Sequence, residues 1–137
     1  MPRTEYLLRP IGQVQSALRE LGEAPRQGPE GAPEAWLDVD LVYAPALTGI
    51  CVGDDVIVVT WLHRADRHVL EVHPRNDLSN PLTGVFATRS PHRPNPLGLH
   101  RVTVHEIRGT RLRIGPIEAI DGTPVVDIKA VLRSDDS

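Results

Sequence analysis

A proline-rich segment holds the side chains of this sequence that are best suited to recognising a charged ligand. Residues 84–99 read GVFATRSPHRPNPLGL and place Arg89, Arg93 and Asn95 among three prolines. Each proline restricts its own φ and the residue before it, so the segment loses conformational freedom before folding. Arginine and amide groups in such a rigid array bind phosphate, carboxylate or a base edge at low entropic cost. A rigid structural turn is the alternative interpretation.

The charge distribution sets this segment apart from the rest of the chain. The net charge of the 137 residues is −3, which by itself argues against nonspecific nucleic-acid binding. Residues 84–117 nevertheless carry a net charge of +5, whereas residues 1–83 carry −5 and residues 118–137 carry −3. The pattern is equally consistent with a basic recognition surface and with a solvated basic face.

Short strands are expected to position this segment. Alternating or β-branched apolar runs separated by turn residues are typical of strands. The expected strands cover residues 6–14, 36–42, 56–62, 68–73, 84–87, 99–107, 111–114, 117–120 and 125–128. A helical turn is expected at 13–22 and a long loop at 23–33. This many short strands predicts an all-β sandwich or barrel, and a barrel removes exposed sheet edges.

Length, composition and motif content disfavour several classes of protein. The length predicts one domain over residues 1–137. Cys51 is the only cysteine, and its β-like context predicts a buried thiol in a reducing, cytoplasmic protein. We find no apolar run long enough for a membrane span, no signal peptide and no dinucleotide motif. The six histidines lack zinc-site spacing, so we expect no metal and place most of them at the surface.

Four motifs together resemble the TsaA-like, TrmO-type family of tRNA methyltransferases. The segment at 84–99 is similar to the family signature, and PRQ at 25–27, WLHR at 61–64 and IDGTPVVDIK at 120–129 fall in the expected order. The resemblance implies a small closed or nearly closed β-barrel of short antiparallel strands with long loops. It also implies a homodimer that binds S-adenosylmethionine and methylates N6 of threonylcarbamoyladenosine in the tRNA anticodon loop.

The same resemblance assigns residues to the cofactor, and the chemistry of methyl transfer suggests candidates for the reaction. The implied cofactor contacts are Pro25, Arg26, Gln27, His63, Arg64, Arg89, Leu99, Ile120, Asp121, Gly122 and Thr123. Methyl transfer is an in-line displacement, and a positive charge stabilises anionic character developing on N6. Arg89 and Arg93 are the candidate charge stabilisers. The expected catalytic residues are Arg93, which could instead bind a carboxylate, Asn95 as partner of the adenine edge, and Asp127 as acid, base or ribose ligand. A structural pairing of Asp127 with Lys129 is equally consistent with the sequence, and no general base is assigned.

Departures from the family pattern leave other functions open. The run at 51–63 is aliphatic where many members are aromatic, and Ala130 and Val131 stand where some members have Pro and Tyr. Some members also carry a further C-terminal domain. The alternatives are a methyltransferase of the same cofactor type for another RNA or a small molecule, a non-catalytic module that binds cofactor or RNA, and a ligand-free interaction barrel.

Overall fold

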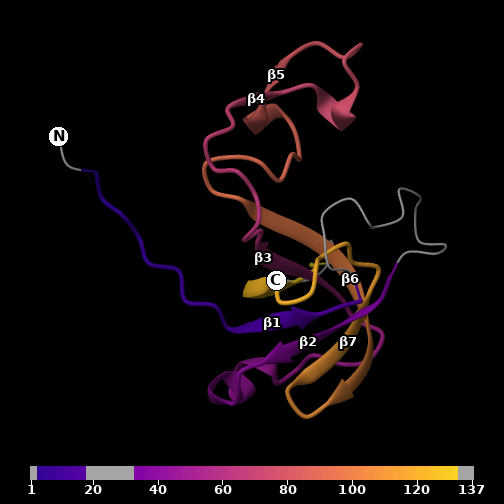
Figure 1. The fold of residues 1–137 in the computed structure, drawn as a ribbon. Coiled ribbons are helices and arrows are strands. Elements are labelled where there is room, and N and C mark those ends of the chain that lie inside the picture. The colour runs from indigo at the N-terminus through magenta and orange to yellow at the C-terminus, as the bar shows by residue number, and fades with distance from the viewer. Residues whose placement is uncertain (1–2, 18–32, 133–137) are drawn as a thin grey trace.

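A closed six-stranded barrel is the centre of the computed structural model, which describes residues 3–17 and 33–132 (Figure 1). The barrel strands are β1 (Gly12–Gln15), β2 (Ala35–Val39), β3 (Asp55–Trp61), β6 (Leu97–Arg108), β7 (Arg111–Gly115) and β8 (Pro124–Ala130). They follow one another in the order β1-β2-β7-β6-β3-β8, and β8 pairs with β1 to close the barrel. All these pairs are antiparallel. The predicted small all-β barrel is therefore confirmed.

The interior of the barrel is aliphatic. Successive strand residues point to opposite faces, and on β2 the buried residues Ala35, Leu37 and Val39 alternate with half-buried ones. The other strands contribute the buried side chains Val14, Val56, Val58, Val102, Val104, Leu112, Ile114 and Val125. Removing this apolar surface from water is the main favourable contribution to folding.

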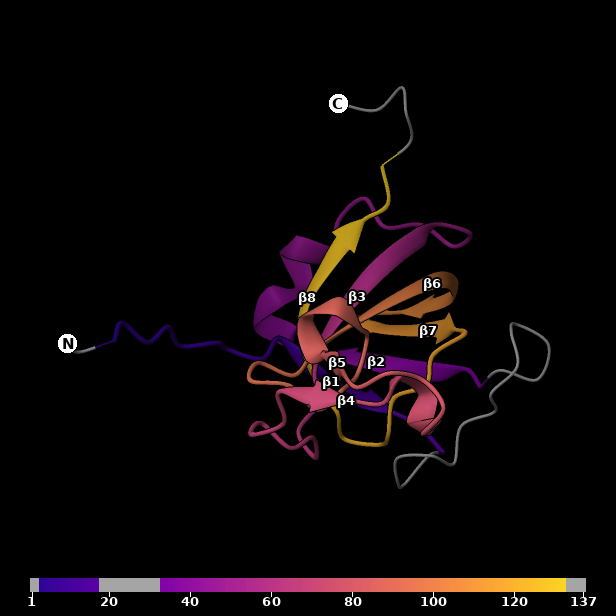
Figure 2. The same ribbon diagram turned by 90° about the horizontal axis from the view of Figure 1, so that it is seen from above.

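A small lobe, residues 68–88, projects from one end of the barrel (Figures 1 and 2). It contains the paired strands β4 (Glu71–Val72) and β5 (Thr83–Gly84) and the 3-10 helices η2 (Pro74–Asn76) and η3 (Val85–Ala87). Within this fully described range Val85 is the one buried residue. The large apolar side chains that stay more than half exposed are Leu70, Leu78, Leu82 and Phe86. A two-stranded sheet alone is at best marginally stable in water, so the lobe depends on contacts outside itself.

The strand boundaries predicted near the N-terminus were partly wrong. Residues 3–10 run away from the barrel as an exposed segment (Figure 2). The Ile11 amide donates to the Val125 carbonyl at 2.8 Å, and β1 begins at Gly12. Pro10 has no N–H to give to a neighbouring strand. After β2 the chain forms the 3-10 helix η1 (Leu41–Leu47) instead of continuing as strand to residue 42. The helical turn predicted at 13–22 is strand at 13–15, and residues 18–32, with most of the predicted loop, lie outside the described residues.

Other local predictions were also wrong. The strand predicted at 84–87 is replaced by the 3-10 helix η3 after Gly84, and within 68–73 only Glu71–Val72 is strand. Residues 117–120 form no strand, although three of the four are buried. The Ile117 amide donates instead to the Pro33 carbonyl at 3.0 Å, because the closed barrel offers no free strand edge for pairing. Cys51 is exposed rather than buried. It lies in a turn where its amide donates to Asp54 Oδ2 at 2.8 Å.

Candidate cofactor site

Two loops leave the same end of the barrel side by side. Strands β3 and β6 are antiparallel with Trp61 opposite Leu97, so the chain that leaves β3 meets the chain that enters β6. Just beyond this pair, the Leu62 amide donates to the Pro96 carbonyl at 2.8 Å. The register of these two strands therefore brings the WLHR motif against the proline-rich segment.

Side chains extend the contact between these loops. The Asp66 amide donates to Nδ1 of His92 at 2.9 Å. Arg67 donates from Nε to the Pro94 carbonyl at 2.6 Å and from Nη2 to Asn95 Oδ1 at 3.2 Å. Both loops are irregular, so these contacts, rather than a strand ladder, fix their relative position.

The IDGT motif forms a tight turn that is tied to β1. Gly122 has a φ of +81°, a conformation that favours glycine. Its amide donates to the Val14 carbonyl at 2.7 Å, and the Val14 amide donates to the Thr123 carbonyl at 2.9 Å. The buried Thr123 hydroxyl donates to the Ile120 carbonyl at 2.6 Å. These bonds hold the turn in one place against the barrel.

A small hollow brings the WLHR and IDGT motifs together. It is lined by Leu62, His63, Arg64, Ala65, Glu118, Ala119, Ile120 and Thr123. Ile120 is buried and Leu62 half-buried, whereas His63 is exposed. An apolar wall thus lies beside polar side chains, which suits a ligand that has both an apolar and a charged part.

A second, larger hollow of about 380 Å³ shares the IDGT turn. It is lined by Gln15, Ser16, Ala17, Glu34, Ala35, Trp36, Arg113 and Asp121. The Ser16 amide donates to Asp121 Oδ1 at 3.0 Å, which fixes the carboxylate at its edge. One turn therefore contributes residues to both hollows.

Known proteins are similar to this chain in sequence and in fold. Residues 13–137 match the family described as the tRNA-methyltransferase O N-terminal domain. The chain belongs to this family. A probable S-adenosyl-L-methionine-binding protein of Methanothermobacter thermautotrophicus is 39% identical over 137 residues, 100% of this chain and 98% of that protein. A putative S-adenosylmethionine-dependent methyltransferase of Pseudomonas aeruginosa is 40% identical over 131 residues, 90% of this chain and 54% of that protein.

A solved structure of the tRNA-methyltransferase O family has the same fold. The crystal structure of TrmO from Pseudomonas aeruginosa matches with a TM-score of 0.75 and 30% sequence identity. The match covers 99% of this chain and 59% of that one. The chain thus spans about three-fifths of the length of TrmO.

Most of the cofactor residues expected from the family lie around the IDGT turn. His63, Arg64, Ile120 and Thr123 line the small hollow, Asp121 lines the larger one, and Gly122 forms the turn itself. Leu99 lies apart from both hollows, on β6 opposite Val59, with 54% of its surface exposed. Pro25, Arg26 and Gln27 lie outside the described residues.

The two arginines of the proline-rich segment have different environments. Arg93 turns back into its own loop and donates to the carbonyls of Thr88 at 3.1 Å, Ser90 at 3.2 Å and Val85 at 2.9 Å. Arg89 is exposed, and no hydrogen bond or ion pair joins it to another described residue. This geometry makes Arg93 a residue that holds the loop, and it leaves Arg89 as the cation that faces solvent.

The other two expected catalytic residues also have partners. The side-chain oxygen of Asn95 accepts from Arg67, which leaves the Asn95 NH₂ group available as a donor. Asp127 pairs with Lys129 at 3.2 Å through Oδ2 and accepts the Ile128 amide at 2.9 Å through Oδ1. The structure therefore contains the pairing that was the structural alternative for Asp127, and Asp127 lines neither hollow.

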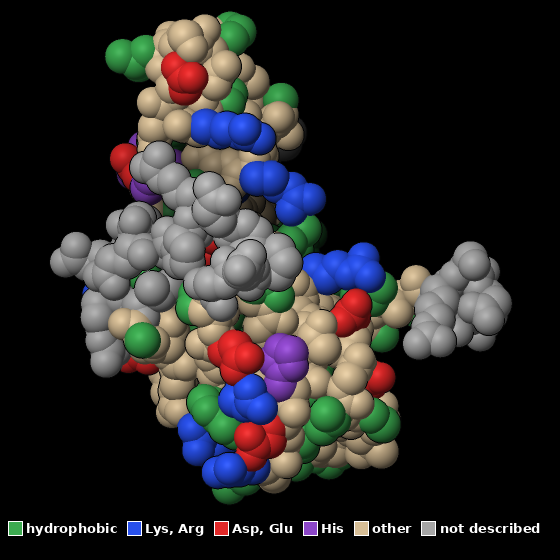
Figure 3. Space-filling view, turned by 90° about the vertical axis from the view of Figure 1, so that its right-hand side faces the viewer, with side chains coloured by type: hydrophobic (Ala, Val, Ile, Leu, Met, Phe, Trp, Pro, Cys, Tyr) green, Lys and Arg blue, Asp and Glu red, His purple; other side chains and the backbone are tan. Residues whose placement is uncertain are grey.

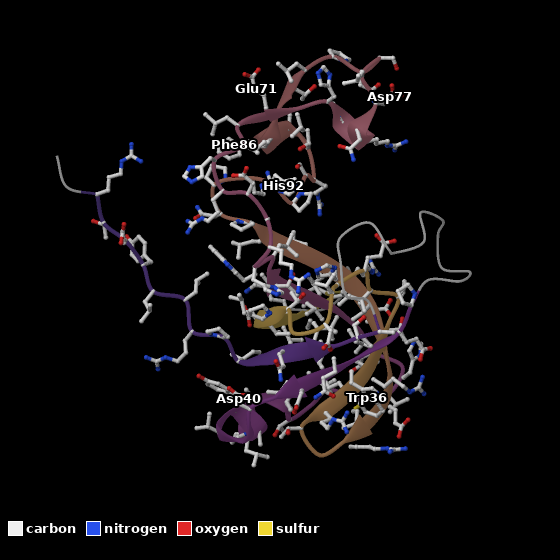
Figure 4. All side chains as sticks on the ribbon, in the orientation of Figure 1. Trp36, Asp40, Glu71, Asp77, Phe86 and His92 are labelled. Carbon is white, nitrogen blue, oxygen red and sulfur yellow. The ribbon has the colours of Figure 1, made fainter. Side chains whose placement is uncertain are left out.

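The basic segment 84–117 does not form one basic surface. Its other four arginines lie beside acidic or aromatic side chains: Arg101 with Asp55, Arg108 and Arg111 with Trp36, and Arg113 with Glu34 and Glu106. Figure 4 places Trp36 low on the barrel, away from His92, which lies where the lobe meets the barrel. Figure 3 shows side chains of both charges close together on one side of the barrel. The fold thus separates Arg89 and Arg93 from the other four.

His100 is a half-buried titratable residue that the sequence motifs did not single out. On β6 it shares a face with the buried residues Gly98 and Val102, so it points into the barrel. Its Nε2 lies 2.9 Å from Oγ1 of Thr60, which is buried. Burial lowers the pKa of His100 from 6.5 to about 4, so the ring is neutral at pH 7. The period-two alternation of LHRVTVHEI indicates this inward orientation of His100, because Val102 and Val104 share its face.

The described part of the chain holds neither a metal-binding cluster nor a membrane-spanning helix. Within residues 3–17 and 33–132, no three His, Cys, Asp or Glu side chains gather where they could hold a metal ion. No helix in the same ranges is long and apolar enough to cross a membrane.

Proposed function

We propose that this chain is an S-adenosylmethionine-dependent methyltransferase that modifies N6 of threonylcarbamoyladenosine in the anticodon loop of tRNA. The observation that carries the proposal is the meeting of the WLHR motif with both the IDGT turn and the proline-rich segment at one end of the barrel. The relatives described as an S-adenosyl-L-methionine-binding protein and an S-adenosylmethionine-dependent methyltransferase support the cofactor and the type of reaction. We place the reaction in the cytoplasm, since one exposed cysteine forms no disulfide within the chain.

The hollow between the WLHR motif and the IDGT turn, about 10 Å³, would contact an edge of this cofactor rather than enclose it. Leu62 and Ile120 offer apolar surface to an adenine ring, and His63 and Arg64 offer polar groups to a ribose or a carboxylate. When bound, S-adenosylmethionine supplies a methyl group on a positively charged sulfur. The role of these side chains is to hold that group in line with the acceptor, because positioning lowers the barrier of such a displacement.

The proline-rich loop supplies the groups that face the acceptor. A carbamoylated N6 is a weak nucleophile, because its lone pair is delocalised into the urea. The exposed Arg89 guanidinium stabilises negative charge that develops there, and the NH₂ group of Asn95 donates to a base edge. Arg93 holds the loop that presents both groups. An anticodon loop offers the unpaired base that such a site requires.

Calorimetric titration with S-adenosylmethionine and S-adenosylhomocysteine tests the cofactor site. We expect wild-type protein to bind both, and Arg64→Ala to raise the dissociation constant about tenfold or more, because Arg64 lines the proposed hollow and a charge-assisted hydrogen bond contributes roughly 1.5–3 kcal/mol. Arg75→Ala is the matched control, since Arg75 is an exposed arginine of the lobe. Unchanged binding by Arg64→Ala removes this residue from the site, and no binding by wild-type protein refutes the proposal.

Mass spectrometry of tRNA nucleosides then tests the substrate. Protein, cofactor and tRNA containing threonylcarbamoyladenosine should give the N6-methylated nucleoside, with a reduced rate for Arg89→Ala. Methylation of a different RNA or of a small molecule would favour the first alternative function. Cofactor binding without transfer to any acceptor would favour a non-catalytic module.

We further propose that the chain acts as a homodimer in which the lobe takes part. The support is the lobe's apolar surface: Leu78 and Phe86 are each 81% exposed, on a segment with little core of its own. Large apolar side chains that stay exposed on a projecting lobe are available to a partner surface.

A double substitution tests the dimer. Leu78→Ser with Phe86→Ser is expected to shift the protein from dimer to monomer in light scattering at micromolar concentration. Leu41→Ser is the control, because Leu41 is also 81% exposed but lies on η1, next to Asp40 at the opposite end of the molecule (Figure 4). A wild-type monomer, or a double variant that stays dimeric, contradicts this proposal.

A further inference from the structure

We propose that Arg67 is a positioning residue that locks the WLHR segment to the proline-rich loop and thereby sets the geometry of the cofactor site. This inference rests on the proposed function, because it deepens the account of the same site. Arg67 belongs to none of the motifs that resemble the family. It lies on the loop that leaves β3, three residues beyond the WLHR motif.

The Arg67 guanidinium makes three contacts at once. Nε donates to the Pro94 carbonyl at 2.6 Å, and Nη2 donates to Asn95 Oδ1 at 3.2 Å. Its central carbon lies 5.0 Å from the centre of the Trp61 ring, within the range of a cation–π contact. A planar fork with several N–H groups and a flat face suits all three, whereas a lysine ammonium on a flexible stem does not reproduce them together.

These contacts close one end of a short turn. Its other end is held where the Leu62 amide donates to the Pro96 carbonyl, and the Ala65 amide donates to the Leu62 carbonyl at 2.9 Å across the turn. His63 and Arg64 lie between the two ends and line the small hollow. Arg67, together with the bond from the Asp66 amide to His92, holds the far end.

The same contacts fix the acceptor side of the proposed site. Arg67 donates a hydrogen bond to the Asn95 side-chain oxygen, and this bond orients the Asn95 NH₂ group away from the guanidinium. It also holds the Pro94 carbonyl, one residue after Arg93. Arg67 therefore joins the segment that lines the cofactor hollow to the loop that carries Arg89 and Asn95.

Two substitutions and a matched control test this role. Arg67→Ala is expected to weaken S-adenosylmethionine binding about tenfold in calorimetry, since an ordered turn becomes free and must be ordered again on binding. Arg67→Lys should retain only part of the wild-type affinity. Arg75→Ala should leave the affinity unchanged, because Arg75 is an exposed residue of η2. The melting temperature should stay within about 3 °C, since the barrel core is untouched.

Trp61 fluorescence in a Trp36→Phe background reports the contact without any ligand. Arg67→Ala should change the Trp61 emission and speed hydrogen exchange at the Asp66 amide, whereas Arg75→Ala should change neither. If wild-type protein binds S-adenosylmethionine and Arg67→Ala binds it equally tightly, the positioning role is overturned and the proposed function is left intact. If wild-type protein binds no cofactor, the proposed function fails. In that case unchanged Trp61 emission and unchanged exchange at the Asp66 amide in Arg67→Ala would overturn the Arg67 contact as well. A change in both would show that Arg67 still links the two loops.

Discussion

Replacing Gly98 with alanine is expected to lower the free energy of unfolding by about 3 kcal/mol, because the position has no room for a methyl group. A Cβ there would lie 2.5 Å from Thr60 Oγ1 and 2.9 Å from His100 Nε2. Both atoms belong to short or rigid side chains inside the barrel, so their mutual hydrogen bond would have to break or move. Leu62 would lie 3.2 Å away, so the change also reaches the wall of the small hollow.

Urea denaturation of the purified variants measures this effect. Gly84→Ala is the matched control, because a Cβ there meets no atom within 4 Å and its φ of −60° suits alanine. Its free energy of unfolding should stay within about 0.5 kcal/mol of wild type. Equal stability of Gly98→Ala and Gly84→Ala would show that the Thr60–His100 pair can move aside at little cost, contrary to this expectation.

His100 is expected to make the protein less stable in mild acid. Its pKa falls from 6.5 to about 4 because burial disfavours the charged ring, so between these pH values the unfolded chain takes up a proton that the folded chain does not. Above pH 6.5 the His100 ring is unprotonated in both the folded and the unfolded chain, and its contribution to the free energy of unfolding is fully present. As the pH falls from 6.5 to about 4, the free energy of unfolding decreases by about 3 kcal/mol, the equivalent of roughly two and a half pKa units.

Urea denaturation of His100→Gln at pH 7 and at pH 4 isolates this contribution. The variant has no ring to protonate, so the loss of stability between the two pH values should be smaller than in wild type by about 3 kcal/mol. His105→Gln is the control, because His105 lies on the same strand but is exposed. The same acid sensitivity in His100→Gln and wild type would show that another group causes it.

Alternation and turn residues predicted the barrel class because they are local properties of the chain. The β-branched run at 56–62 became β3, and the alternating run at 99–107 became the longer β6. The alternation also predicts the orientation of His100, because residues two apart on a strand, such as His100 and Val102, point to the same face. The expected strand at 117–120 failed because pairing requires a neighbouring edge, which local pattern does not report.

The sequence by itself determined the barrel class, the family and the three site motifs, since each is written in neighbouring residues. Which motifs touch was decided only by the tertiary structure: the register of β3 against β6 places Arg67 beside Pro94, 27 residues further along the chain. The tertiary structure likewise turned Arg93 into its own loop and left Arg89 exposed. Two arginines four residues apart look alike in a sequence, and only the carbonyls that the fold gathers around one of them set their roles apart.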